Sequence, residues 1–171
     1  DLRLDWCHAY HLNSDVPITH LGIYSISIDD RIMTTLHSMS TLRVVSFEDC
    51  TFDMDHGTKS HAAYRGLCDL LLRLEEVNIY EEGVDTRFKP ELITAQLRSS
   101  TTLTSFGLTL VEKTTNYDVI LDALVENTTL TSLRLDVYRL STDSICRLIR
   151  HNTTLRRLSI KVKKFRLSYK K

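Results

Sequence analysis

Glycine and proline are scarce in this chain, with five and two residues among 171. So few glycines leave no place for a glycine-rich phosphate loop or a dinucleotide fingerprint. The sequence also lacks a nucleophile elbow and other catalytic signatures. We therefore expect no enzymatic activity, no catalytic residues, no cofactor and no small-molecule substrate.

Long apolar runs are missing as well. No window approaches the roughly 18 uninterrupted apolar residues of a transmembrane helix. Residues 1–10 have neither the basic start nor the apolar stretch of a signal peptide. With 42% apolar and 26% charged residues, the composition is that of a globular domain with a sizeable core. We expect no membrane partner and a cytoplasmic location.

No C-x-x-C pair occurs among the four cysteines, which favours reduced thiols in an intracellular protein over a redox or zinc motif. The segment "DMDHGTKSH" gathers Asp53, Asp55, His56 and His61. It lacks the helical H-x-x-x-H spacing of a metal site, and Gly57 indicates a turn. We interpret the segment as a solvated loop and expect no metal.

The formal net charge is zero, but the two signs are separated along the chain. Residues 1–86 contain 15 acidic and 6 basic side chains, a net charge of −9, and residues 87–171 contain 7 and 16, a net charge of +9. An elongated fold would therefore carry opposite charges at its two ends.

What the sequence does contain is a repeat. "NTTLTSLRL" at residues 127–135 returns 25 positions later as "NTTLRRLSI" at residues 152–160. The template L-x-x-L-x-L, with apolar residues at its three fixed positions, fits six segments whose starts lie 24, 32, 29, 27 and 25 residues apart. These segments begin at Ile18, Leu42, Leu74, Leu103, Leu130 and Leu155, and "LRLDWC" at Leu2 fits the last part of a seventh.

Helical patterns lie between these strand-like segments. Each has apolar residues at helical spacing, and most begin at a residue that favours a helix start, such as Asp29, Pro90, Asn116 or Ser141. The predicted helices cover residues 29–40, 60–74, 89–100, 116–127 and 141–152. Each unit is therefore expected to contain a short strand, a turn and a helix.

This arrangement resembles a leucine-rich repeat protein, and units with a full helix resemble the ribonuclease-inhibitor-like subclass. The resemblance implies an α/β fold: a leucine-rich repeat solenoid of about six to seven repeats, with a curved parallel sheet on the concave face and helices on the convex face. It covers residues 1–171 as a single domain. The chain begins without Met and inside the pattern, so a fragment of a longer repeat array is an open alternative.

Two polar positions recur within the pattern. Asn127 and Asn152 begin N-x-T sequons, but both end a predicted helix just before a strand. We therefore expect left-handed turn residues there rather than glycosylation sites. Cys7 and Cys50 take the position where this repeat class usually carries Asn or Cys, and we expect them to be buried structural thiols.

Binding is expected on the concave face, where alternate strand residues point away from the core. This face is acidic and rich in tyrosine in the first half and basic at the end, which suits a folded protein partner. By residue type, Tyr24, Tyr80 and Arg134 are the expected anchors. The full set of predicted contact residues is Tyr24, Glu48, Glu76, Asn78, Tyr80, Arg134, Asp136, Arg157 and Lys161.

The leading interpretation is a non-enzymatic protein-interaction scaffold whose protein partner is not identified. One alternative is a nucleic-acid-binding module that uses the basic C-terminal segment "KVKKFRLSYKK", although a solvated terminal strand explains the same charges. Another is the substrate-recognition part of a ubiquitin ligase, a role that proteins resembling this one often have. Trp6 fits a partner anchor and a cover for the open end of the solenoid equally well.

Overall fold

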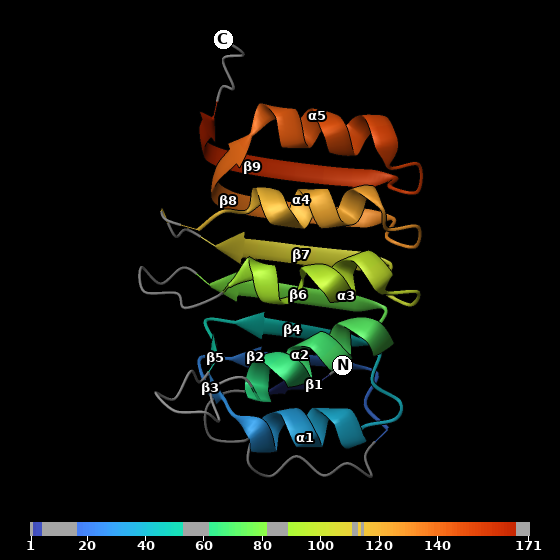
Figure 1. Cartoon of the computed structure of the whole chain (residues 1–171). Coiled ribbons are helices and arrows are strands. Elements are labelled where there is room, and N and C mark those ends of the chain that lie inside the picture. Colours follow the sequence, from blue (N-terminus) through green and yellow to red (C-terminus); the bar gives the residue numbers. More distant parts are fainter. Residues whose placement is uncertain are drawn as a thin grey trace.

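The computed structural model describes residues 2–4, 17–52, 62–81, 89–110, 113 and 115–166. Seven strands form one parallel sheet in which their spatial order follows their order along the chain (Figure 1). The α/β prediction with a parallel sheet is thus confirmed. The strands are β1 (Leu2–Leu4), β2 (His20–Tyr24), β4 (Val44–Glu48), β6 (Glu76–Glu81), β7 (Ser105–Leu110), β8 (Ser132–Ser141) and β9 (Arg157–Arg166).

A layer of helices lies over one face of this sheet (Figure 1). Each helix connects two consecutive strands and packs against the next helix along the chain. A second, two-stranded sheet pairs β3 with β5 beside this layer. These elements are β3 (Ser27–Ile28), α1 (Asp30–Ser38), β5 (Thr51–Phe52), α2 (Ala62–Arg73), η2 (Pro90–Leu92), α3 (Thr94–Ser99), α4 (Asp118–Val125) and α5 (Thr142–His151).

The helix starts follow from capping side chains that the sequence predicts. The Asp29 carboxylate accepts a hydrogen bond from the Ile32 N–H at 2.9 Å, and the Ser141 hydroxyl accepts one from the Asp143 N–H at 3.2 Å. Such oxygens satisfy amide groups that have no partner within the first turn of a helix. Helices α1 and α5 therefore begin directly after the capping residues Asp29 and Ser141.

The helix predicted over residues 89–100 is divided in two. Its first part is the 3-10 turn η2, in which the Leu92 and Ile93 amides bond to carbonyls three residues earlier. The α-helical part, α3, starts only at Thr94. The difference follows from these tighter hydrogen bonds, which are usual at helix termini.

The strands are in register at every repeat of the template. The first apolar position within each strand forms one row across the sheet and the second forms another, and both rows are buried from β2 to β8. The first row is Leu21, Val45, Val77, Phe106, Leu133 and Leu158, and the second is Ile23, Phe47, Ile79, Leu108, Leu135 and Ile160.

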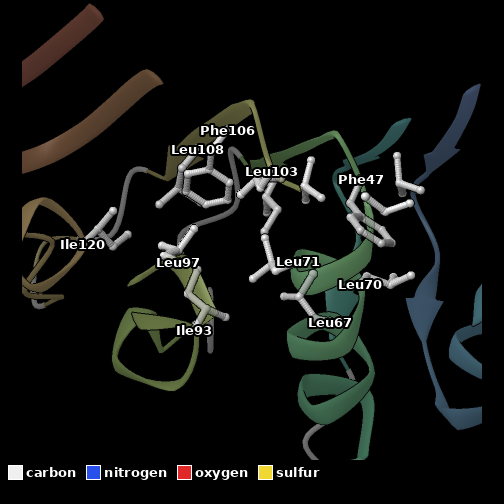
Figure 2. Packing of buried hydrophobic residues seen from close by; sticks show 14 of the residues in the cluster. Phe47, Leu67, Leu70, Leu71, Ile93, Leu97, Leu103, Phe106, Leu108 and Ile120 are labelled. Atoms are coloured by element: carbon white, nitrogen blue, oxygen red, sulfur yellow. The ribbon is translucent and has the colours of Figure 1, made fainter. Parts of the chain in front are cut away.

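Helix side chains pack onto these rows to complete the core. Figure 2 shows Leu67, Leu70 and Leu71 of α2 and Leu97 of α3 directed toward strand residues such as Phe106. All five are almost fully buried. Because burying a Leu or Phe side chain stabilises a fold by roughly 1.5–3 kcal/mol, this continuous core dominates the stability of the stacked units.

A polar ladder ties neighbouring units together at the helix ends. The Asn127 amide nitrogen donates to the carbonyl oxygens of Leu97 and Ser100, at 2.6 and 3.4 Å. Its Oδ1 accepts from the backbone amides of Thr129 and Leu130, at 2.9 and 2.7 Å. One side chain thus provides hydrogen-bond partners for carbonyl groups at the helix end of the preceding unit and for amide groups in the turn of its own unit.

The ladder continues with other side chains at other interfaces. Asn152 makes the corresponding four bonds one unit further along. Between α1 and α2, the Arg73 guanidinium donates to the Leu36 and Met39 carbonyls at 2.8 and 2.9 Å. Asn and Arg side chains therefore both donate hydrogen bonds to backbone carbonyls of the preceding unit, at different interfaces.

The prediction that Asn127 and Asn152 are left-handed turn residues is wrong. Asn152 has φ −81° and ψ 124°, and Asn127 is not among the described residues with positive φ. The role of Asn at these positions comes from its side-chain amide, which both donates and accepts hydrogen bonds, and not from its tolerance of a left-handed backbone. The Asn127 side chain is 2% exposed, and both hydrogen bonds that its amide nitrogen donates go to backbone carbonyls within the protein. In the folded chain this nitrogen is therefore not accessible to a glycosylating enzyme.

The stacking surface is exposed at the β9 end. Ile149 on α5 and Leu158 on β9 are 62% and 39% exposed, whereas their neighbours in earlier units are largely covered.

The described helices include none that is long and apolar enough to cross a bilayer.

Candidate functional site

The sheet face opposite the helices is the face on which binding was predicted. We name it the open face, because no helix of the described residues covers it. The strand register aligns the residues of this face in three rows, and the nine predicted contact residues are among them. The rows are His20, Val44, Glu76, Ser105, Ser132 and Arg157; Gly22, Ser46, Asn78, Gly107, Arg134 and Ser159; and Tyr24, Glu48, Tyr80, Thr109, Asp136 and Lys161.

The open face is hollowed by a cavity of about 510 Å³. That volume lies in the range of about 300–1,000 Å³ that is usual for ligand-binding pockets. The cavity extends across five strands from β2 to β8. Its lining residues are Tyr24, Ser46, Glu48, Asp49, Tyr80, Thr109 and Arg134.

Small residues in the middle row create room for the larger side chains. An added Cβ at Gly22 would lie 2.7 Å from Cε2 of Tyr24, so this ring lies back over the glycine of its own strand. A Cβ at Gly107 would collide with the Asn78 amide, which donates to Glu76 Oε1 at 2.8 Å. Glycine at these two positions therefore permits a close approach of side chains across the face.

Tyr80 and Arg134 contact each other across the strand that separates them. The Arg134 guanidinium carbon lies 5.8 Å from the centre of the Tyr80 ring, and Nη1 is 3.5 Å from the tyrosine hydroxyl. This distance is within the range of a cation–π interaction, which is worth about 0.5–1 kcal/mol at an exposed site. The two predicted anchors thus form one side of the cavity.

Asp49 is a cavity residue that sequence reasoning missed. It follows β4 with φ 52°, and its amide donates to the Tyr80 carbonyl at 2.7 Å. Ser25 occupies the equivalent position after β2 with φ 54°. Asp49 lies after the end of β4, where side chains no longer alternate between the two faces of the sheet. The alternation of buried and exposed strand positions therefore did not predict it. Its residue type was the available signal, because Asp adopts the left-handed region more readily than most residues.

The other predicted contact residues lie on the open face but outside the cavity lining. Glu76 and Asn78 are hydrogen-bonded to each other, and Asp136 forms an ion pair with Lys161 at 3.5 Å. Arg157 is exposed on β9. The acidic members of this set lie on β6 and β8, and the basic members lie on β9.

Cys50 is buried, as predicted, and its thiol donates to the Ile23 carbonyl at 3.3 Å. Burial raises the pKa of the Cys50 thiol, so the thiol stays protonated near neutral pH. Cys7, Trp6 and the segment at 53–61 lie outside the described residues. Within the described ranges, no group of three or more His, Cys, Asp or Glu side chains is placed to hold a metal ion.

Comparisons of this chain with protein-family models, with curated proteins and with solved structures find no match. The geometry of the open face is therefore the basis for the proposed function.

Proposed function

We propose that this chain is a leucine-rich repeat protein of the ribonuclease-inhibitor-like kind that binds a protein partner on its open face, without catalysing a reaction. The observation that carries the proposal is the sheet face that no described helix covers. Its three rows combine tyrosines, both charge signs and a cavity, whereas the opposite face is occupied by packed helices. Mixed faces with aromatic and Arg anchors are typical of protein interfaces.

The geometry also favours particular anchors within that face. Tyr80 and Arg134 hold each other in a defined arrangement before any partner arrives. Preorganised side chains lose less conformational freedom on binding, so they retain more of their contact energy. Tyr and Arg are also the residue types most often found as binding hot spots.

Affinity capture from a cell extract tests the proposal. The open-face variant Tyr80→Ala/Arg134→Ala is compared with wild type and with the control Leu72→Ala/Arg98→Ala, which removes exposed apolar and basic side chains from the helix layer. We expect the control to retain a protein partner and the open-face variant to lose it. Equal capture by all three proteins would refute open-face binding, provided that thermal unfolding shows each variant to be folded.

Nucleic-acid binding is the second candidate, because β9 exposes a series of basic side chains. The exposed residues are Arg157, Lys161, Lys163 and Lys164 of β9, together with Arg156 just before it. Binding through phosphate contacts would weaken steeply as salt increases. A capture that disappears after nuclease treatment but survives the open-face substitutions would support this candidate over the first.

A further inference from the structure

Strands β8 and β9 continue beyond the end of their neighbour β7. The pairing of β7 with β8 ends at Val137, whereas β9 stays paired with β8 as far as Ser141. Among the described strands, only β9 therefore lies beside the last four residues of β8. We name residues 138–141 of β8 and 163–166 of β9 the two-stranded extension.

Two lysine ammonium groups lie near one tyrosine ring of this extension. Lys113, three residues after the end of β7, and Lys164 of β9 each place Nζ 6.0 Å from the centre of the Tyr138 ring. Each distance is at the limit of a cation–π interaction. Because both are measured from one centre, the two ammonium nitrogens are no more than twice that distance apart.

No carboxylate among the described residues forms an ion pair with either lysine. The ion pairs found in that part of the chain involve other cations. Asp136, the acid of β8, is paired with Lys161 instead, at 3.5 Å. Two like charges gathered near one point repel each other, so an anion that binds between them relieves this repulsion.

Further polar groups surround the same ring. Arg139 and Lys163 are exposed, and the pairs on either side of it in the register set Lys163 beside Tyr138. Tyr138 is half-buried, and its hydroxyl is a hydrogen-bond donor. The extension thus brings cationic side chains and a hydroxyl donor to one place.

This place adjoins the open face. Arg134, Asp136 and Tyr138 are alternate residues of β8, and the residues between them, Leu135 and Val137, are buried. Side chains at alternate positions of a strand point to the same face of a sheet. A partner that covers the open face would therefore reach Tyr138 along the same strand.

A phosphate monoester suits the site better than a carboxylate or a phosphodiester. Near neutral pH it carries a charge of about −1.5 to −2 and three acceptor oxygens, so one group can accept from both ammonium groups and from the hydroxyl. A carboxylate or a phosphodiester carries one charge, and a nucleic acid distributes its charges along a line. The flexible stem of lysine lets its point charge approach a phosphate.

We propose that Lys113, Tyr138 and Lys164 bind a phosphate group carried by a serine, threonine or tyrosine side chain of the protein partner. This proposal rests on the proposed function and specifies a chemical feature of the partner that the margin of the open face recognises.

The probe for this site is N-acetyl-phosphoserine methylamide, titrated into the isotope-labelled full chain and followed by amide chemical shifts. The glutamate analogue and dimethyl phosphate each carry one negative charge and serve as comparisons. We expect saturable shifts at residues of the extension with the phosphoserine compound, and affinities for the other two at least about fivefold weaker. Affinity should fall as salt increases, because the lysines are exposed.

Charge-removing variants locate the binding site. Lys113→Gln/Lys164→Gln removes both ammonium groups, and Tyr138→Phe removes the hydroxyl but keeps the ring. The matched control Arg65→Gln/Lys89→Gln removes two exposed cations, one on α2 and one just before η2. We expect the lysine variant to weaken phosphoserine binding by at least about tenfold, Tyr138→Phe by about twofold to fivefold, and the control to leave it unchanged.

The source of the phosphate is tested with the captured partner. Phosphatase treatment of the extract before affinity capture should reduce the amount of partner bound, and so should Lys113→Gln/Lys164→Gln. An octanucleotide of thymidine, titrated under the same conditions, is the nucleic-acid comparison. Tighter binding of this oligonucleotide than of the phosphoserine compound, with shifts at the same residues, would overturn the proposal in favour of nucleic acid.

Other results would also overturn the proposal. They are equal binding of the phosphoserine and glutamate compounds, unchanged binding by the lysine variant, and no saturable shift up to roughly tens of millimolar phosphoserine compound. The proposed function is judged separately. If the phosphoserine compound binds but Tyr80→Ala/Arg134→Ala retains the partner, the proposed function fails and the phosphate site stands. If the partner is lost from that variant but the phosphoserine compound does not bind, only the phosphate proposal fails.

Discussion

Replacing Asn127 by Ala tests the polar ladder that holds successive units together. The substitution removes an amide that is 2% exposed and bonded to four backbone groups. Three of these bonds are short, those to the Leu97 carbonyl and from the Thr129 and Leu130 amides, at 2.6, 2.9 and 2.7 Å. All three backbone groups would lose their partner within or next to the core.

The expected loss follows from the number of groups left without a partner. A buried donor or acceptor that loses its hydrogen bond costs about 1–3 kcal/mol. Taking the lower end for three groups, because a small cavity admits some relaxation, Asn127→Ala should destabilise the chain by about 3 kcal/mol. For a chain of this size that corresponds to a decrease in Tm of roughly 6–12 °C.

Asn152→Ala is the matched comparison. Asn152 makes the same four bonds, but its side chain is half-buried in the last described unit. Water can replace part of the lost bonding there, so we expect a loss of about 1 kcal/mol. Chemical denaturation of wild type and both variants measures the difference. A loss below about 1 kcal/mol for Asn127→Ala would refute the ladder as a stabilising device, and equal losses for the two variants would refute the role of burial.

Three further predictions concern the helix layer and the thiols. Gly66→Ala gains about 1 kcal/mol of helix propensity, but its Cβ would lie 2.8 Å from Cβ and Cγ of Met33. Overpacking of this kind costs about 1–3 kcal/mol, so a lower Tm in a thermal melt is expected and a raised Tm would contradict close packing of α1 on α2. Alkylation at pH 8, followed by peptide mass spectrometry, should modify the exposed Cys146 well before the buried Cys50, and the reverse order would contradict the burial. Because the pKa of Cys50 is raised in the folded state, its contribution to stability is complete below the unfolded thiol pKa of about 8.5 and is lost as pH rises above it. A denaturation series should therefore show an alkaline decrease in stability that Cys50→Ala reduces.

The rows of the open face were predictable because strand alternation has a period of two. Once the buried positions such as Leu133 and Leu135 are identified, the residue between them, Arg134, must point to the other face. The repeated template also aligns one strand with the next, which predicts that Tyr24, Glu48 and Tyr80 are neighbours. Local pattern and packing agree here, so counting along the sequence was sufficient.

The cavity itself was not predictable in this way. Its shape depends on how far side chains extend, as when Tyr24 bends over Gly22, and on the left-handed turn that brings Asp49 to the rim. The ladder escaped prediction for a related reason. Arg73 and Asn127 share one role, but they share neither residue type nor position within the template. Such equivalence is visible only when the acceptor carbonyls are seen in three dimensions.

The central claim is that a protein partner contacts the open face, and site-specific photo-crosslinking tests it most directly. A photoreactive amino acid replaces Ser105, a half-buried residue in the middle of the open face, or Leu72, an exposed residue on α2 in the helix layer. With the captured partner present, we predict a cross-linked product from position 105 and none from position 72. Cross-linking from position 72 alone would contradict the account, because the partner would then lie on the helices.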